Sequence, residues 1–398
     1  MPTATDIVYD PYDYVVDADP HPVWKRMRDE RPVYYNEQYD FYALSRYADV
    51  YEASLDWQTF SSAKGSVLEI IRNPEMLEVS RNMLFMDPPE HDQHRALIGR
   101  RFTPRQVAKM EAGMRDICAG YLDPLVGSDG FDYVQDFGAL VPMMVICTFM
   151  GLPKEDHNTV RRLADAMVHR DEGEQNMPLE LQFIVARYFD GALAIREFEP
   201  RDDFISELIT AHITLEDGST RSLDQGERLR MLGLVTGGGN ETVGRALSWS
   251  AALLAEFPDQ RRMLVENPEL IPGAIEEIVR YEAPSPVQAR VTTREVTLHD
   301  VTIPEGAVVL LLTNSANRDE RVFPDADRFD ITRTLEQQHL GFGLGTHFCV
   351  GASLARLEVR VALEETLRRF PTWEVDWPNV ERTHTSTVRG YHRLPILL

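Results

Sequence analysis

A glycine-rich segment that contains a cysteine holds the residues best suited to chemistry in this 398-residue chain. Residues 339–356 read HLGFGLGTHFCVGASLAR, with glycines at 341, 343 and 345 before Cys349. Glycine permits positive φ and a close backbone approach, and helical periodicity begins just after the cysteine. A thiolate near a helix N-terminus is stabilised by free N–H groups and the helix dipole. Cys349 is therefore a candidate metal ligand or nucleophile.

The same segment allows other interpretations. A lone cysteine is most often buried and inert. A dinucleotide-binding loop would need a glycine three residues after Gly343, where the chain has Thr346. A zinc site would need further ligands, and the chain has no Cys-x-x-Cys or His-Glu-x-x-His motif. The residues alone leave the inert thiol and the functional thiolate both open.

A run of three glycines lies inside the strongest helical pattern, at 225–257. Residues 237–242 read GGGNET. Each interior glycine costs a helix roughly 0.5–1 kcal/mol relative to alanine. One explanation is a close crossing with another helix. The other is a helix that passes a ligand and offers Glu241 and Thr242 for proton transfer.

Two charged pairs have helical spacing. Glu277 and Arg280 are three residues apart, so they share one helix face, although such pairs mostly lie on solvated surfaces. His91 and Arg95 are four apart and would form a clamp for an anionic group. A metal site on the face of His91 and His94 lacks further ligands in the sequence.

Helices are expected to position most of these residues. Apolar residues recur at helical spacing in the following segments: 90–101, 104–125, 137–151, 155–169, 179–197, 203–212, 225–257, 259–267, 271–281 and 351–369. Shorter expected elements are a helix at 21–30, a β-hairpin at 32–43, a loop with a short helix at 60–85, and strands at 288–292, 295–298 and 307–312. No linker divides the chain, so we expect one mainly α domain, 1–398, with a small β region.

Composition excludes several classes of protein. Asp and Glu number 64 against 41 Lys and Arg, a net charge of −23, which disfavours nucleic-acid binding. Three cysteines exclude a disulfide framework and suit a reducing compartment. The acidic N-terminus has no secretory pattern, and the apolar run 137–150 contains Pro142 and is too short for a bilayer. We expect a cytoplasmic protein with no membrane segment.

Taken together, in this order, these motifs resemble the cytochrome P-450 family of haem-thiolate monooxygenases. The resemblance rests on the 342–351 run FGLGTHFCVG, on Glu277-x-x-Arg280, on the GGNET helix and on Asn317-Arg318-Asp319. It covers nearly the whole chain and is of the bacterial type. It implies the mainly α cytochrome P-450 fold, with a long central helix over the haem.

The resemblance also implies how the cofactor, haem b, is held. Cys349 would be the thiolate ligand of the iron, and Phe342 would shield it. Gly343, Gly345 and Gly351 would bring the backbone close to the macrocycle and direct N–H groups to the sulfur. The residues expected to bind the propionates are His91, Arg95, Arg290 and His347.

Further roles follow from the same resemblance. Thr242 and Glu241 match an acid–alcohol pair beside the oxygen site, in which the hydroxyl donates a hydrogen bond and the carboxylate relays protons from solvent. Many family members have Asp in place of Glu241, so the relay geometry here can differ. Glu277, Arg280 and Arg328 match a buried structural triad, although the family often has Pro where this chain has Ala326.

The substrate is expected to be a hydrophobic small molecule, such as a steroid, terpenoid, macrolide or fatty acid. The loop 62–85 and the region 165–195 should contribute to the pocket. The individual residues expected to line it are Val235, Gly238, Pro286, Val287, Thr387 and Val388. With O₂ as co-substrate, the chain would hydroxylate that molecule.

No reductase segment is present in this sequence, so we expect an acidic ferredoxin, reduced by its own reductase, to donate the electrons. We expect the protein to be a monomer. The ferredoxin would dock on a group of cations near Cys349: Arg95, Arg100, Arg101, Arg105, Lys109, Arg356 and Arg360. Rival interpretations are a peroxide-using or C–C coupling enzyme, a haem sensor or carrier without turnover, and a non-haem thiol enzyme. Glu241-Thr242 argues against the peroxide user.

Overall fold

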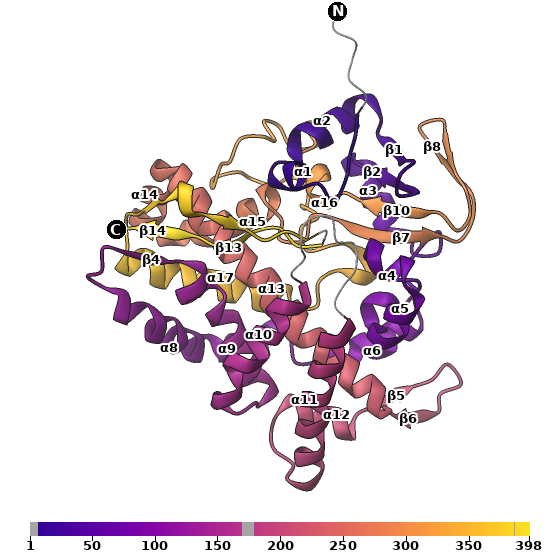
Figure 1. Cartoon of the computed structure of the whole chain (residues 1–398), viewed down its shortest axis with the longest axis horizontal. Coiled ribbons are helices and arrows are strands. Elements are labelled where there is room, and N and C mark those ends of the chain that lie inside the picture. Colours follow the sequence, from indigo (N-terminus) through magenta and orange to yellow (C-terminus); the bar gives the residue numbers. More distant parts are fainter. Residues whose placement is uncertain (1–6, 169–178, 386) are drawn as a thin grey trace, which may run out of the picture.

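Helices make up most of the computed structural model, which describes residues 7–168, 179–385 and 387–398 (Figure 1). The α-helices are α1 (Tyr14–Ala18), α2 (His21–Glu30), α3 (Tyr47–Leu55), α4 (Leu68–Arg72), α5 (Pro74–Ser80), α6 (Glu90–Gly99), α7 (Pro104–Val107), α8 (Glu111–Leu122), α9 (Leu140–Met150), α10 (His157–Val168), α11 (Leu179–Phe198), α12 (Phe204–Thr210), α13 (Gln225–Glu256), α14 (Pro258–Glu266), α15 (Ile271–Tyr281), α16 (Thr313–Ala316) and α17 (Ala352–Arg369).

Helix α13 runs through the middle of the molecule (Figure 1). Its N-terminus is fixed by a capping box, in which the Asp224 side chain accepts from the Glu227 N–H and the Glu227 carboxylate accepts from the Asp224 N–H. The main hydrophobic core surrounds it and joins side chains of α8, α9, α13, α15 and α17. A 32-residue helix with six glycines is therefore stabilised by packing along its length.

A small mixed sheet lies beside the helices, in the strand order β1-β2-β10-β7-β3. Its strands are β1 (Val33–Asn36), β2 (Phe41–Leu44), β3 (Phe60–Ser61), β7 (Gln288–Thr292) and β10 (Val308–Leu311). The remaining strands are β4 (Gly130–Asp132), β5 (His212–Thr214), β6 (Thr220–Ser222), β8 (Val296–Leu298), β9 (Val301–Ile303), β11 (Glu374–Val375), β12 (Glu381–Arg382), β13 (Tyr391–Arg393) and β14 (Pro395–Leu397). The expected hairpin is present, with Val33 opposite Leu44.

The mainly α class with a small β region is confirmed, and the differences are local. The expected helix 104–125 is divided, because the chain tightens into a 3₁₀ turn at Ala108–Met110 between α7 and α8. Apolar periodicity does not separate these two helix types. The hairpin β5–β6 was not expected, although Asp217-Gly218 is a turn signal and Gly218 has φ +82°.

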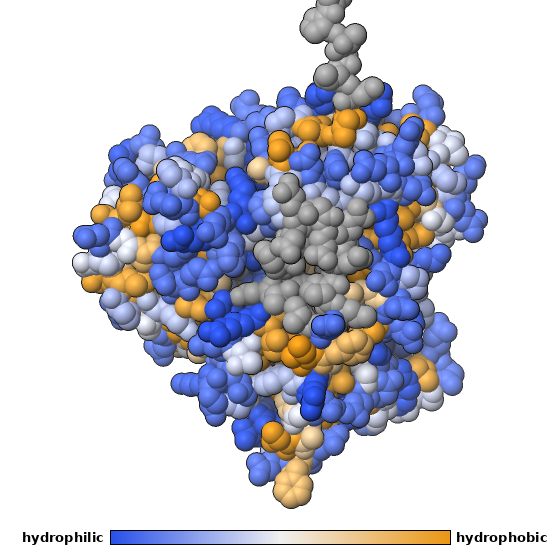
Figure 2. All heavy atoms as spheres, in the orientation of Figure 1, coloured by the Kyte–Doolittle hydropathy of each residue, from blue (hydrophilic) through white to orange (hydrophobic). Residues whose placement is uncertain are grey.

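The surface is mainly hydrophilic on the face shown in Figure 2, with apolar side chains gathered in separate patches. Exposed apolar side chains on α11 include Phe183, Ile184 and Ile195. Among the described residues, no helix combines the length and apolar character needed to cross a bilayer. Part of the region 165–195 that we expect at the pocket, residues 169–178, lies outside the described residues.

Candidate active site

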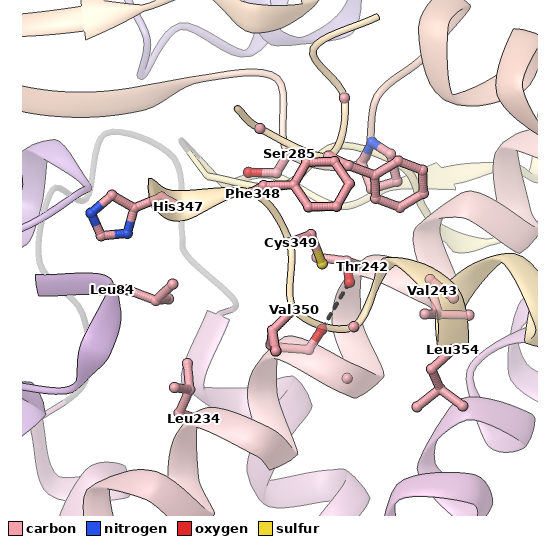
Figure 3. A pocket seen from close by; sticks show the side chains of 18 of the residues that line it. Leu84, Leu234, Thr242, Val243, Ser285, His347, Phe348, Cys349, Val350 and Leu354 are labelled. Carbon is pink, nitrogen blue, oxygen red and sulfur yellow. Dashed lines mark hydrogen bonds between the residues drawn. The ribbon is translucent and has the colours of Figure 1, made fainter. Parts of the chain in front are cut away.

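A cavity of about 330 Å³ lies between α13, α6, β7 and the loop that leads into α17 (Figure 3). Cys349 lies on this loop and Thr242 on α13, and both line the cavity. Most of the other lining side chains are apolar. Of the residues predicted to form the site, the following line it: Cys349, His91, Arg95, Arg290, His347, Phe342, Gly343, Gly351, Thr242, Val235, Gly238 and Val287.

The loop before Cys349 has the backbone that its glycines predict. Gly343 and Gly345 have φ of +68° and +63°, in the left-handed region that favours glycine. At Gly341, a Cβ atom would lie 2.5 Å from Cγ1 of Val279, so glycine lets the loop pack directly on α15. The Cys349 N–H donates to the Phe342 carbonyl at 2.8 Å and closes the loop. The cysteine is thereby fixed by local backbone geometry.

The Cys349 side chain is accessible from the cavity. Burial of the surrounding loop raises the pKa of its thiol, whereas the Gly351 N–H, Arg95 and Arg356 all favour the thiolate. The Arg356 guanidinium lies 4.3 Å from the centre of the Phe342 ring, which also lines the cavity. The arrangement suits a metal-ligating thiolate, because binding to a cation removes the penalty for the charged form.

Four cationic or potentially cationic side chains meet at one end of the cavity. Arg290 is 3% exposed, donates to the Ala289 carbonyl and to Gln288 Oε1, and forms no ion pair with the described residues. Burial lowers its pKa to about 10. The rings of His91 and His347 lie 4.6 Å apart, and burial, with Arg290 as the next cause, lowers the pKa of His347 to about 2.

This end of the cavity fits an anionic group. The Nε2 atoms of His91 and His347 are buried without hydrogen-bond partners among the described residues. Arg95 also lines the cavity. Uncompensated buried cations are unfavourable, and carboxylates that accept charge-assisted hydrogen bonds would stabilise them. The thiol and this cationic end therefore fit an iron porphyrin with propionate groups.

The glycines of α13 perform two different tasks. A Cβ on Gly239 would lie 2.4 Å from Cδ1 of Ile146, so this glycine permits the close crossing of α9 and α13. A Cβ on Gly238 would meet no atom within 4 Å, because Gly238 faces the cavity. The Thr242 hydroxyl donates to the Gly238 carbonyl at 2.8 Å, one turn earlier. The close helix crossing is therefore confirmed at Gly239, whereas Gly238 and Thr242 face the cavity.

Glu241 does not line the cavity. Its side chain is 5% exposed, and Oε2 accepts a hydrogen bond of 2.7 Å from Nη2 of Arg245. Oε1 lies 3.5 Å from Nδ2 of Asn240. Glu241 and Thr242 were expected to share one site, but only Thr242 lines the cavity, and the Glu241 carboxylate binds Arg245.

The pair Glu277–Arg280 is a buried ion pair with bidentate geometry. Arg280 donates to both carboxylate oxygens of Glu277 at 2.7 and 2.8 Å, and it also donates to the carbonyls of Asn317 and Ala326. The two side chains are 0% and 2% exposed. A guanidinium that satisfies this many backbone carbonyls holds the segment 317–328 on α15.

The prediction that Arg328 completes this cluster is wrong. The Arg328 side chain is 70% exposed and lies 3.5 Å from Asp330, and only its carbonyl accepts from Arg280. The third member is Arg333, whose Nε donates to Oε1 of Glu277 at 3.2 Å. The turn closed by the Arg328 N–H and the Asp325 carbonyl directs the Arg328 side chain outward.

Three predicted pocket residues are not on the cavity wall. Pro286 is buried, and its carbonyl accepts from Thr313 Oγ1 and from the Asn314 N–H. The Val388 N–H and carbonyl are both bound to Oγ1 of Thr385. Thr387 borders a separate hollow of about 10 Å³ beside the sheet.

Other lining residues had no motif. Ser285 and Val287 both face the cavity. Side chains two residues apart in an extended chain share one face, so the prediction of Val287 as a pocket residue also indicates Ser285. Leu84 and Leu234 also point into it (Figure 3). Glu358 of α17 lines it too: it is 1% exposed, neither oxygen has a partner among the described residues, and burial raises its pKa well above 4.5.

Three of the seven expected docking cations are paired with acidic side chains of the chain itself. Arg101 binds Glu207, and Arg356 binds Glu276. Arg360 binds Glu111 and Glu364. Arg95, which lines the cavity, forms no ion pair with described residues. The same holds for Arg100, Arg105 and Lys109, and these three are exposed.

Comparisons with known proteins agree with this geometry. The cytochrome P-450 family model matches residues 193–388. A putative cytochrome P-450 123 of Mycobacterium tuberculosis is 39% identical over 395 residues, 98% of this chain and 97% of the relative. Among solved structures, CYP109Q5 of Chondromyces apiculatus is 33% identical, with a TM-score of 0.87 over 98% of this chain and 97% of that one.

A further solved relative contains a ligand. The structure of CYP109E1 of Bacillus megaterium in complex with testosterone is 27% identical to this chain, with a TM-score of 0.86 over 95% of this chain and 97% of that one. These relatives cover the chain from end to end, and the cysteine loop, the cationic end of the cavity and the central helix agree with them. The chain therefore belongs to the cytochrome P-450 family of haem-thiolate monooxygenases.

Proposed function

We propose that the protein binds haem b through Cys349 and hydroxylates a hydrophobic small molecule. One observation carries the proposal: an accessible cysteine on a glycine-fixed loop shares a cavity with four basic side chains, His91, Arg95, Arg290 and His347. Bound haem iron would supply the activation of O₂. The substrate C–H bond takes up one oxygen atom, and the other leaves as water after uptake of two electrons and two protons.

The chain's own residues would act on the two sides of the porphyrin. The cationic end orients the propionates, and the loop that contains Gly343, Gly345 and Gly351 supports the thiolate. Thr242 faces the cavity from α13 and holds a proton-donating hydroxyl at the distal side. Glu241, the preceding residue, would supply protons to that side from its position behind the helix.

The cavity wall opposite Cys349 indicates the substrate class. Leu84, Leu234, Val235 and Val287 are apolar, and Gly238 leaves additional space. A steroid, terpenoid or fatty-acid-like molecule would bury its surface here, with Ser285 as a hydrogen-bonding group. The testosterone held by CYP109E1 is a ligand of this kind.

Electrons would come from an acidic ferredoxin, reduced by its own reductase. A groove of about 320 Å³ lies between α7, α8, α15 and α17, and it is lined by Pro104, Val107, Leu357 and Arg356. Arg356 contacts Phe342, so this groove is one side chain away from the cavity. Because Arg100, Arg105 and Lys109 are exposed and form no ion pair with described residues, we expect the reduction rate to decrease with rising salt.

We further propose that the chain is a single domain, 1–398, that acts as a monomer in the cytoplasm. All three cysteines are free thiols, and Cys118 and Cys147 are buried. Burial raises the pKa of both to about 12, so they are unreactive in a reducing compartment. Gel filtration with light scattering measures the oligomeric state.

The absorption spectrum of the purified protein tests the proposal. The dithionite-reduced carbon monoxide complex should show the Soret band of a thiolate-ligated haem, and Cys349→Ser should lose it, whereas Cys147→Ser should keep it. A carbonyl band of the histidine-ligated kind in the wild type would contradict the thiolate. Testosterone and hexadecenoic acid, added to the ferric protein, should produce a spin-state shift with at least one of them.

A further inference from the structure

One carboxylate on α15, that of Glu276, binds side chains on both sides of the cysteine loop. Its Oε2 accepts from Nε2 of His339 at 3.1 Å and from Nη2 of Arg356 at 2.9 Å. Its Oε1 accepts from Nε of Arg356 at 2.6 Å. His339 precedes the glycines of the loop, and Arg356 follows Cys349 on α17. Glu276 therefore holds the two ends of the segment that contains the cysteine.

The hydrogen bonds of His339 determine which of its nitrogens carries the proton. The Gly341 N–H donates to Nδ1 of His339 at 3.1 Å, so Nδ1 carries no proton. The proton is therefore on Nε2, which donates to Glu276. Burial raises the pKa of Glu276, but Arg356 and His339 outweigh burial and lower it to about 2. Glu276 is thus an anion whose charge is balanced by Arg356.

Arg356 connects this carboxylate with the thiol. Its guanidinium lies 4.3 Å from the centre of the Phe342 ring, and both Phe342 and Cys349 line the cavity. Burial raises the pKa of the Cys349 thiol, and the charge of Arg356 is one of the causes that oppose burial. Glu276 and Arg356 also line the groove between α7, α8, α15 and α17. The pair therefore lies between this groove and the cysteine loop.

We propose that Glu276 is a positioning residue that sets the reduction potential of the bound haem through Arg356. A cation near Cys349 favours the electron-rich state of a thiolate-bound iron and raises its reduction potential, whereas an anion lowers it. Glu276 holds the guanidinium over Phe342 and offsets part of its charge. The potential thus lies between the values that either residue alone would give. This inference rests on the proposed binding of haem through Cys349.

The test measures the reduction potential of the holoenzyme by spectroelectrochemical titration. Glu276→Gln removes the negative charge but keeps an oxygen that accepts from Arg356, so the potential should rise. Arg356→Met removes the positive charge, so the potential should fall. Arg356→Lys keeps that charge, so its potential should lie closer to the wild-type value than that of Arg356→Met.

We expect each of the two charge changes to alter the equilibrium constant of reduction about threefold, which is about 28 mV for one electron. The effect is limited because the side chains of Glu276 and Arg356 are 29% and 38% exposed, and solvent screens both charges. In the double variant Glu276→Gln/Arg356→Met, the opposite shifts should partly cancel.

Glu276→Ala separates the positioning role from a simple effect of charge. This variant loses the negative charge and also the oxygens that hold Arg356 over Phe342. The departure of the guanidinium lowers the potential, so Glu276→Ala should have a lower potential than Glu276→Gln. Equal potentials in the two variants would show that Glu276 does not act through Arg356, and would overturn the inference.

Glu111→Gln and Arg115→Met are the matched controls. Glu111 lines the same groove, and the two residues form an ion pair of 2.7 Å on α8. Their side chains are 33% and 35% exposed, close to the values for Glu276 and Arg356. Among the described residues, the charges that act on the Cys349 sulfur are those of Arg95 and Arg356. Both controls should therefore keep the wild-type potential.

Shifts of the same sign in Glu276→Gln and Arg356→Met would show that the variants only disturb the loop, and would overturn the inference. Wild-type potentials in both variants would do the same. Loss of the haem spectrum in Glu276→Gln would make Glu276 a structural residue. In that case Arg356→Met and Arg356→Lys would still show whether the cation raises the potential.

The reduced carbonyl spectrum separates the inference from the proposed function. If the wild type lacks the Soret band of a thiolate-ligated haem, Cys349 is not the ligand, and the inference falls with the proposed function. If the wild type and the variants show that band but their potentials agree, the thiolate assignment stands and only the role of Glu276 is wrong.

Discussion

The two walls of the cavity are built in different ways. The wall with Cys349 is one continuous segment, and its shape is determined by glycines at positive φ and by a backbone hydrogen bond between Cys349 and Phe342. The opposite wall is assembled from short pieces of α13, the 83–84 region and the 284–288 segment. The first wall can be recognised in a short stretch of sequence, whereas the second exists only after the chain has folded.

The buried cluster behind the first wall should give the largest stability effect. Arg280→Met leaves Glu277 charged and 2% exposed, so we expect a loss of about 3–5 kcal/mol in the free energy of unfolding. Arg333→Met should cost less, because its side chain is 12% exposed. Denaturant unfolding of the holoenzyme measures both.

Arg328→Met is the matched control for this cluster. Its side chain is 70% exposed, so we expect a change within about 0.5 kcal/mol. An Arg328 variant as destabilised as the Arg333 variant would restore the original assignment of the triad.

The same difference, between structure set by one segment and structure assembled from several, separates the sequence-based predictions that succeeded from those that failed. Local signals indicated the backbone of the cysteine loop, the helix α13 and the shared helix face of Glu277 and Arg280, because each lies within one element. The burial of that pair and the role of Cys349 were expected only from the family resemblance. The exchange of Arg328 for Arg333 could not be predicted, because it depends on how the turn at 325–328 directs its side chains. The same applies to Pro286, whose position relative to the cavity depends on the strand pairing of β7.

Glu358 should give a pH-dependent effect of intermediate size. The pKa of its buried carboxyl is raised in the folded state, so unfolding releases its proton at any pH between 4.5 and that raised value. Stability then falls as pH rises through this window, by up to about 1.4 kcal/mol per unit. Glu358→Gln removes the penalty, so the variant should gain stability over the wild type from pH 5 to 8.

Glu365 of the same helix is the control with the opposite sign. Its pKa is lowered to about 2: burial raises it, but Arg368, Arg369 and Arg115 outweigh burial. Its stabilisation is therefore complete above 4.5 and is lost only as pH falls below that value. Glu365→Gln should be destabilised by a constant amount from pH 5 to 8. A parallel, pH-independent offset for Glu358→Gln would show that Glu358 is ionised in the folded protein.

Gly239→Ala tests the helix crossing. The new Cβ would lie 2.4 Å from Cδ1 of Ile146, so the Ile146 side chain or the helix must shift. We expect a loss of about 1–3 kcal/mol in the free energy of unfolding. Ile146→Val in the same chain should recover part of this loss, because it removes the methyl group in contact. If Ile146→Val recovers no stability, the cost of Gly239→Ala comes from strain in the α13 backbone and not from the contact with Ile146.

Gly238→Ala is the adjacent substitution and should have a small effect on stability, of the opposite sign to that of Gly239→Ala. Its Cβ meets no atom within 4 Å, so the helix should gain about 0.5–1 kcal/mol from the better propensity of alanine. The methyl group would instead occupy space in the cavity and narrow it beside Leu234 and Val235. Titration of the ferric spin-state shift should then show weaker binding of testosterone than of the slimmer hexadecenoic acid. Equal changes for both ligands would place the substrate away from Gly238, and a destabilised Gly238→Ala would show that the two neighbouring glycines face the same crowded surface.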